Sequence, residues 1–169
     1  MNYFGAVAFS EISFLLGYTI YEDKTISEKI IYENIAIPYK EFIEKSWPKE
    51  YHNICDEFES NTVLIICRNA VTEGMYAPGK SIYTYIDALA KGGQNIKVLV
   101  LDSIDEEFKL LSNLFDSISI VKIDDGPIEH KFKLVIDQIK LTRPKAIMTE
   151  IEFGLPSVIS ILNPKYKFL

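Results

Sequence analysis

The chain has 169 residues, 48% of them hydrophobic, and a formal net charge of −6. This length and apolar content suffice for one domain with an appendage, and the negative charge without a long basic run argues against a nucleic-acid partner. The two cysteines, Cys55 and Cys67, form neither a disulfide framework nor a metal cluster, so we expect a cytoplasmic chain.

The first 60 residues predict an all-helical segment. Tyr3–Ile20 is apolar, but Glu11 lies in its middle, and it has neither a basic start nor a small-residue cleavage site. We therefore expect a buried helix there rather than a membrane span or a signal peptide. Further helices are expected from Ser27 to Pro38, over Tyr39–Ser46 and over Glu50–Glu59.

Beyond residue 60, strand patterns and helix patterns alternate. Strands are expected at Val63–Cys67, Ile96–Leu101, Ile118–Ile123, Ala146–Met148 and Tyr166–Leu169. Helices with apolar stripes are expected from Ser81 to Gly92, after Asp105, after Pro127 and over Pro156–Leu162. The first of these should turn Ile82, Tyr85, Ile86, Leu89 and Ala90 inward and end with Gly92 in the left-handed conformation. The helix after Pro127 should turn Phe132, Val135, Ile136 and Ile139 inward and end at Arg143-Pro144. This alternation predicts an α/β fold: an open, parallel, Rossmann-like sheet in the order 3-2-1-4-5. The predicted domains are thus a helical appendage, 1–60, and a Rossmann-like domain, 61–169, that stops inside its fifth strand.

The loop after the first strand contains a phosphate-binding string. Gly74 to Ser81 reads Gly-Met-Tyr-Ala-Pro-Gly-Lys-Ser, a complete match to G-x-x-x-x-G-K-[ST]. Backbone N–H groups at a helix start attract anions, so Gly74, Tyr76, Gly79, Lys80 and Ser81 are candidate phosphate or substrate ligands. The six residues between Cys67 and Gly74 argue against the compact loop of a nucleoside triphosphatase. The other interpretation is that Ser81 caps the helix and Lys80 is solvated.

Acidic residues after two of the later strands could likewise bind a ligand or have a purely structural role. Asp102 ends the second apolar run and either holds a ribose or sugar hydroxyl or caps the next turn. Asp124-Asp125 precedes Gly126-Pro127, which is typical of a turn rather than a metal-binding pair, so no metal site is expected.

Several sequence segments of the chain resemble the amino-terminal half of glycosyltransferases with the two-domain GT-B architecture. The segments are Val63–Ile66, the loop ending at Pro78–Ser81, Leu89–Gly93, Ile96–Leu101 and Thr142–Met148. The helical segment before them also resembles, more weakly, protein glucosyltransferases that modify bacterial adhesins. The resemblance implies an acceptor-side domain that binds a sugar or a protein acceptor. It also implies a nucleotide-sugar donor held mainly by a second domain, no other cofactor, and no transfer by this chain alone.

Glu150 and Glu152 follow the fourth strand and point the same way if the segment is extended. A carboxylate facing the ligand crevice between the first and fourth strands could accept a proton from an acceptor hydroxyl, which makes both residues candidate catalytic bases. The other interpretation is that they favour the start of the next helix electrostatically.

The last expectation concerns partners. An unpaired strand edge at Tyr166–Leu169 and an apolar stripe from Phe4 to Leu16 predict association, with a missing second domain or with another copy, and no more than peripheral membrane contact. Two functions outside sugar transfer stay open: a nucleotide-binding protein that uses Gly74–Ser81, and a non-catalytic interaction module.

Overall fold

The computed structural model describes residue 33 and residues 37–54, 60–72, 77–123, 126–150 and 155–165. Its helices are α3 (Ile37–Ser46), η2 (Lys49–Tyr51), α4 (Ala77–Lys91), α5 (Glu106–Leu114), α6 (Ile128–Thr142) and α7 (Leu155–Leu162). Its strands are β1 (Thr62–Ala70), β2 (Asn95–Ile104), β3 (Ile118–Lys122) and β4 (Ala146–Glu150). The helix predicted over Tyr3–Ile20, most of the helix predicted from Ser27 to Pro38, and the strand predicted over Tyr166–Leu169 lie outside the described residues.

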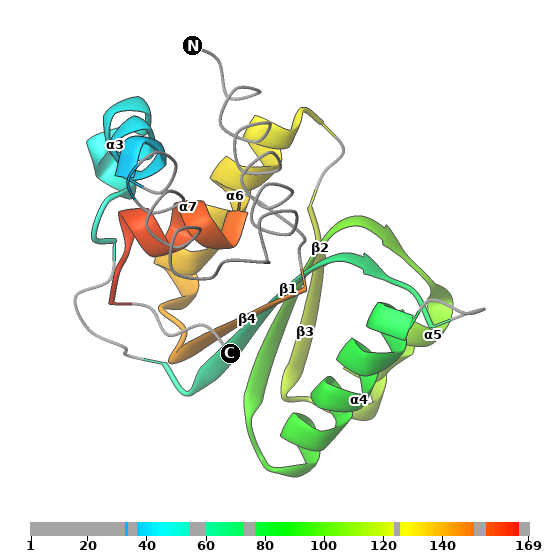
Figure 1. Cartoon of the computed structure of the whole chain (residues 1–169). Helices are drawn as coiled ribbons and strands as arrows, with labels where there is room; N and C mark the ends of the chain where they lie inside the picture. The colour runs from blue at the N-terminus through cyan, green and yellow to red at the C-terminus, as the bar shows by residue number, and fades with distance from the viewer. Residues whose placement is uncertain are drawn as a thin grey trace, which may run out of the picture. The chain divides into compact units, whose positions relative to one another are not determined.

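The chain divides into two compact units (Figure 1). One unit contains α3, η2 and α7. The other, called the sheet unit below, contains the four strands with α4, α5 and α6. Because α7 groups with α3, the units do not follow the predicted division at residue 60.

In the first unit, the end of α7 is joined to the segment after η2. The amide of Asn53 donates to Leu162 O at 2.9 Å, and the amide of Ile54 donates to the side chain of Asn163 at 2.7 Å. Asn163 is buried and also donates to Tyr51 O. The helix predicted over Glu50–Glu59 is therefore wrong from residue 53 to residue 54, since the amides of Asn53 and Ile54 bond to Leu162 and Asn163 instead of to the preceding turn.

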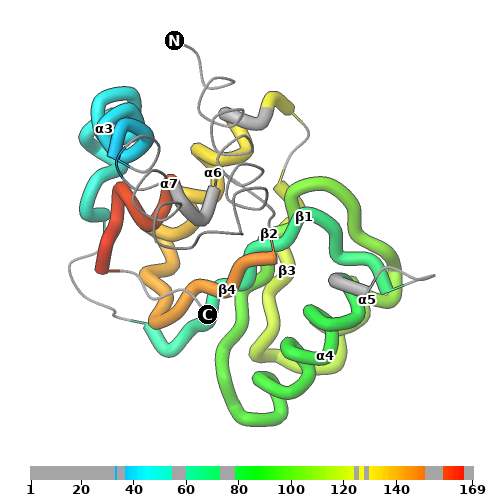
Figure 2. Tube along the Cα trace, viewed as in Figure 1, coloured from blue at the N-terminus to red at the C-terminus, as the bar shows by residue number. Residues whose placement is uncertain are grey.

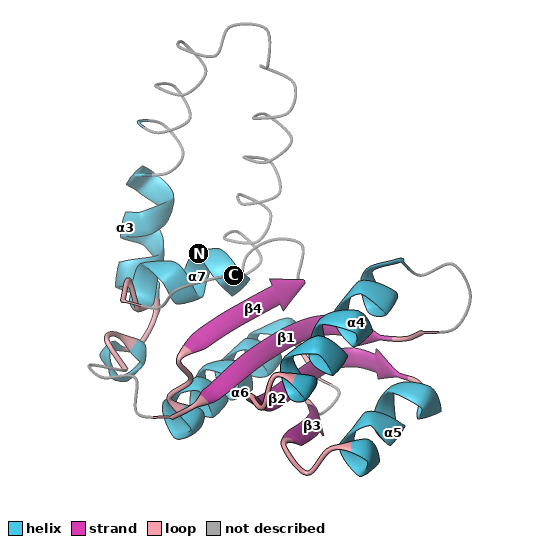
Figure 3. Ribbon diagram, turned by 90° about the horizontal axis from the view of Figure 1, so that it is seen from below, coloured by secondary structure: helices cyan, strands magenta, loops and turns pink. Residues whose placement is uncertain are grey.

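In the part of the sheet unit that the structure describes, four parallel strands lie in the order β3-β2-β1-β4, as predicted for the first four strands. Residues Val63–Cys67 of β1 are buried without interruption, which is expected of a parallel strand covered on both faces. α4 and α5 cover one face of the sheet and α6 covers the other (Figure 3).

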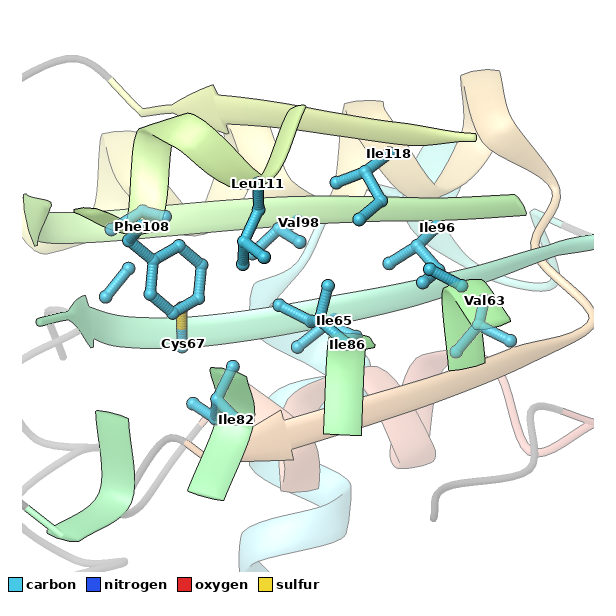
Figure 4. Packing of buried hydrophobic residues seen from close by; sticks show 13 residues of the cluster. Val63, Ile65, Cys67, Ile82, Ile86, Ile96, Val98, Phe108, Leu111 and Ile118 are labelled. Atoms are coloured by element: carbon cyan, nitrogen blue, oxygen red, sulfur yellow. The ribbon is translucent and has the colours of Figure 1, made fainter. Parts of the chain in front are cut away.

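A continuous apolar core lies between the sheet and the helices α4 and α5 (Figure 4). It contains Ile82 and Ile86 of α4, Phe108 and Leu111 of α5, and alternate residues of β1 and β2. The predicted stripe of α4 is correct at Ile82, Ile86 and Ala90, but Tyr85 is 51% exposed. A helix that rests on a sheet along one line buries a narrower stripe than its apolar pattern predicts.

The end of α4 forms a Schellman cap. Gly93 has φ of 74°, its amide donates to Ala90 O, and the amide of Gln94 donates to Leu89 O. The prediction placed the left-handed residue at Gly92, but Gly93 adopts that conformation.

Two central strands continue beyond their apolar runs. β1 extends to Ala70 and β2 to Ile104, with Asn69 paired to Ser103 and Ala70 to Ile104. The hydroxyl of Ser103 also donates to Asn69 Oδ1 at 2.6 Å. Residues 68–70, predicted as loop, are therefore part of the sheet, because the backbone ladder continues through polar residues.

Candidate functional site

The winding of the sheet reverses at β1. From β1 the chain continues to β2 and β3 on one side, whereas β4 pairs with β1 on the other side (Figure 2). In open parallel sheets, ligands bind outside the carboxyl ends of the strands at this reversal. The carboxyl ends of β1, β2 and β4 are therefore the candidate site.

A register shift between β1 and β2 shapes this edge of the sheet. Cys67 pairs with Val100 and Asn69 pairs with Ser103, so Arg68 stands opposite two residues, Leu101 and Asp102. An extra residue of this kind is a β-bulge, which redirects the side chains beside it. The bulge brings Arg68 and Asp102 into contact.

Arg68, Asp102 and Lys131 form a cluster, called the charged cluster below. Arg68 Nε donates to Asp102 Oδ2 at 2.7 Å, and Lys131 Nζ donates to Asp102 Oδ1, also at 2.7 Å. Lys131 comes from α6, and its side chain is only 9% exposed. Its ammonium group donates a second hydrogen bond, to Leu101 O at 2.7 Å, which compensates part of the cost of burying a charge.

The charged cluster keeps Asp102 ionised. Partial burial raises the pKa of this carboxyl group, but the hydrogen bonds and positive charges of Lys131 and Arg68 outweigh burial and hold the pKa below its usual value. β2 continues to Ile104, and Asp105 rather than Asp102 caps the helix that follows, so the prediction that Asp102 caps the next turn is wrong. Each carboxylate oxygen of Asp102 accepts a hydrogen bond from a cation. A ribose or sugar hydroxyl bound to Asp102 would therefore have to share one of these oxygens with Arg68 or Lys131.

Glu150, a candidate base, is the last residue of β4 and is half-buried. It pairs in register with Cys67 of β1, so both side chains project from the same face of the sheet. Burial, together with the negative charge of Glu150, raises the pKa of the Cys67 thiol to about 12. The Cys67 Sγ lies 3.7 Å from Leu99 O. Cys67 is thus a protonated core residue rather than a nucleophile.

A second polar group links β1 to α5. Asp105 caps α5 by accepting from the amide of Phe108 at 2.8 Å, and its own amide donates to Ala70 O. The Thr72 hydroxyl lies 2.9 Å from Asp105 Oδ2 and 2.7 Å from Glu107 Oε2. The Thr72 amide also donates to Asp105. These bonds fix the start of the connection that follows β1.

The phosphate-binding string lies differently from the prediction. α4 begins at Ala77, so Gly79 and Lys80 are in its first turn and Ser81 is inside the helix. Ser81 therefore cannot be the cap of this helix, and that interpretation is wrong. Gly79 is buried, whereas Lys80 and Ser81 are exposed. Gly74, Tyr76, Glu152 and Asp124-Asp125 lie outside the described residues.

Sequence reasoning missed the lysine that organises the site. Lys131 precedes the correctly predicted inward stripe of α6, the residues Phe132, Val135, Ile136 and Ile139, all of which are buried. Lys131 lies four residues before Val135 and eight before Ile139, and so belongs to the same helix face. A lysine on the apolar face of a helix could have been interpreted as a buried charge that needs a partner, and this was the signal in the sequence.

Comparison with known proteins adds no assignment: no protein-family model matches the chain, and no solved structure matches it. Within the described ranges, no group of three or more His, Cys, Asp or Glu side chains could hold a metal ion. None of the described helices combines the length and apolar character that crossing a membrane requires.

Proposed function

We propose that the sheet unit is the acceptor-side domain of a glycosyltransferase with GT-B architecture and binds a sugar or a protein acceptor at the carboxyl ends of β1 and β4. The observation that carries the proposal is the order β3-β2-β1-β4, with its reversal of winding between β1 and β4. A fold of this kind hosts many functions. The resemblance of Leu89–Gly93 and Thr142–Met148 to sequence segments of glycosyltransferases supports sugar transfer among these functions.

In this proposal Glu150 is the base that accepts the proton of the acceptor hydroxyl. Its position at the end of β4 lies beside the reversal, and its partial burial reduces competition from water. A nucleotide-sugar donor would be held mainly by a second domain, so we expect no sugar transfer by this chain alone.

Sugar binding tests the proposal directly. The labelled chain is applied to an array of immobilised mono- and oligosaccharides, and a sugar that binds is then titrated against the 15N-labelled chain. We expect amide shifts concentrated at residues 66–72 of β1 and its connection and at 148–150 of β4. Glu150→Gln should retain binding within about threefold, because an amide preserves the shape and hydrogen-bonding capacity of the side chain. Glu106→Gln, on an exposed carboxylate of α5, is the matched control.

Two results would contradict the proposal: no sugar on the array binds, or the shifts lie at the amino ends of the strands. Transfer is examined separately, by mass spectrometry of the chain incubated with UDP-sugars and GDP-sugars. A glycosylated product would contradict the requirement for a second domain.

The complete string at Gly74–Ser81 supports a second proposal, nucleotide binding through the start of α4. The described geometry supports it less. A nucleotide-bound Mg²⁺ would need a carboxylate after the next apolar strand, and Asp102, which stands there, is bound by two cations. Calorimetry with ATP and GTP in the presence of Mg²⁺ tests it. Heat of binding that Lys80→Ala abolishes and Lys91→Ala preserves would support it, and no heat with either nucleotide would remove it.

A further inference from the structure

The charged cluster brings two cations together in an acidic chain. It contains two cations and one carboxylate, whereas the whole chain has a formal net charge of −6. The three side chains come from β1, β2 and α6 and meet at the carboxyl edge of the sheet, where open parallel sheets bind ligands.

The two cations of this cluster are placed for different roles. The Lys131 side chain is 9% exposed, and its ammonium group donates to Leu101 O and Asp102 Oδ1. The Arg68 side chain is 67% exposed. Lys131 is therefore an internal anchor of the carboxylate, and Arg68 is the cation that solvent, or a solute, reaches.

Stability alone does not account for this arrangement. An exposed arginine–carboxylate pair contributes little to stability, and burying an ammonium group costs free energy that its partners only offset. The arrangement does restrict the arginine. The bond from Nε to Asp102 Oδ2, at 2.7 Å, orients the guanidinium plane, and Asp102 is itself held through Lys131 to the backbone of β2. Such preorganisation lowers the entropic cost of binding a ligand.

We propose that Arg68 binds an oxyanion, either a phosphate or a carboxylate group of a ligand, and that Asp102 and Lys131 are positioning residues for it. A guanidinium group carries five N–H donors in a fixed fork that matches the spacing of oxyanion oxygens. Nε of Arg68 donates to Asp102, and the side chain is 67% exposed, so a solute reaches the guanidinium group at this edge of the sheet. The inference does not depend on sugar transfer, because it concerns the charge of the ligand rather than its class.

The test is a titration of the 15N-labelled chain with two probes, inorganic phosphate and sodium acetate, at about 0.01 M ionic strength so that screening is weak. We expect saturable amide shifts at residues 66–70 and 101–104 with at least one probe. Shifts with phosphate alone identify a phosphate group, and shifts with both identify a general oxyanion site.

Three variants make the result specific. Arg68→Gln should weaken binding at least about tenfold, since it removes the charged donor. Arg68→Lys keeps the charge without the fork and should weaken binding several-fold. Arg143→Gln removes the only other arginine of the chain, which follows α6 at the amino edge of the sheet, and should bind as the unaltered chain does. Arg68 is exposed, so the variants should stay folded, and their amide spectra check this.

Several outcomes would overturn the inference. It fails if neither probe gives saturable shifts, if Arg68→Gln binds as tightly as the unaltered chain, or if Arg143→Gln weakens binding equally. Equal binding by Arg68→Lys would overturn the positioning roles of Asp102 and Lys131, because a flexible point charge would then suffice.

Discussion

The two parts of β1 are stabilised in different ways. From Val63 to Cys67 every side chain is buried and apolar, so this part depends on packing against the helices on both faces. Arg68, the next residue, is exposed and charged, and its partner Asp102 is 34 positions away in the sequence. Along β1, the side chains thus change from buried and apolar to exposed and charged between Cys67 and Arg68.

This difference separates stability from function within one strand. Apolar burial is non-directional and contributes about 25 cal/mol per Å² wherever the area is removed from water. The polar edge depends on a few bonds with fixed geometry, each contributing about 1–3 kcal/mol when a charge is involved. Changes in the core should therefore unfold the sheet unit, whereas changes at the edge should alter binding and pH dependence with smaller losses of stability.

The largest effect is expected in the core, from Phe108→Ala. Phe108 is fully buried and contacts Tyr83 edge to face, with 6.1 Å between ring centroids. Removal of the ring leaves a cavity and should lower the free energy of unfolding by about 3–5 kcal/mol, measured by urea denaturation. Leu110→Ala, on the same helix at 54% exposure, is the control and should change it by no more than about 0.5 kcal/mol. Equal effects of the two changes would contradict the comparison.

A smaller loss of stability is expected from Lys131→Met at the edge. The change removes one of the two cations on Asp102 but leaves Arg68, so the loss should be about 1–3 kcal/mol rather than the larger loss of an isolated buried pair. Urea denaturation measures it against Lys133→Met, an exposed position of α6. If Lys131→Met stabilises the chain, the cluster costs more free energy than it supplies.

Loss of the α5 cap should have an effect of about 1 kcal/mol. Asp105→Ala removes the acceptor for the amide of Phe108 and for Thr72, and helix caps of this kind contribute about 0.5–2 kcal/mol. The thermal midpoint should fall, and amide exchange should accelerate first in α5. Asp105→Asn keeps an acceptor and should recover most of the loss, so an equal loss in both variants would show that the cap is not the cause.

The smallest effect is the pH dependence that Asp102 contributes. Its pKa is lower in the folded chain, so its stabilisation is fully present above the ordinary aspartate value of about 3.9 and is lost as the pH falls through the folded value. The difference in unfolding free energy between the chain and Asp102→Asn should be constant from about pH 7 to 5 and shrink below about pH 4. Solvent screening keeps the pH-dependent part of this difference under about 1 kcal/mol. A difference that grows in acid would contradict the assignment.

Much of the secondary structure of the sheet unit could be predicted from the local pattern of apolar residues. The apolar runs at Val63–Cys67 and Ile96–Leu101 mark strands buried on both faces, and the inward stripe of α6 is fully correct. The end of α6 is also as predicted: the helix stops at Thr142, before Arg143-Pro144, because proline disfavours helical geometry in the residue before it.

The ends of the helices and strands, and the residues with which their backbones pair, could be predicted less well. The ladder between β1 and β2 continues through Asn69 and Ser103 because backbone pairing does not require apolar side chains. The start of α4 at Ala77 precedes the first apolar residue of its stripe, so periodicity could not place it. Residues 53–54 are not helical because the amides of Asn53 and Ile54 bond to Leu162 and Asn163, more than 100 residues later.

By itself, the sequence determined the alternation of strands and helices, the order of the four described strands, and the residues that form the core, because hydrophobic burial depends on spacing along the chain. Only the tertiary structure decided which charges meet. Asp102 contacts Arg68 and Lys131 because a bulge in β2 and the packing of α6 bring together residues about 30 positions apart. A one-residue change in register would separate them, and local pattern does not encode such a register.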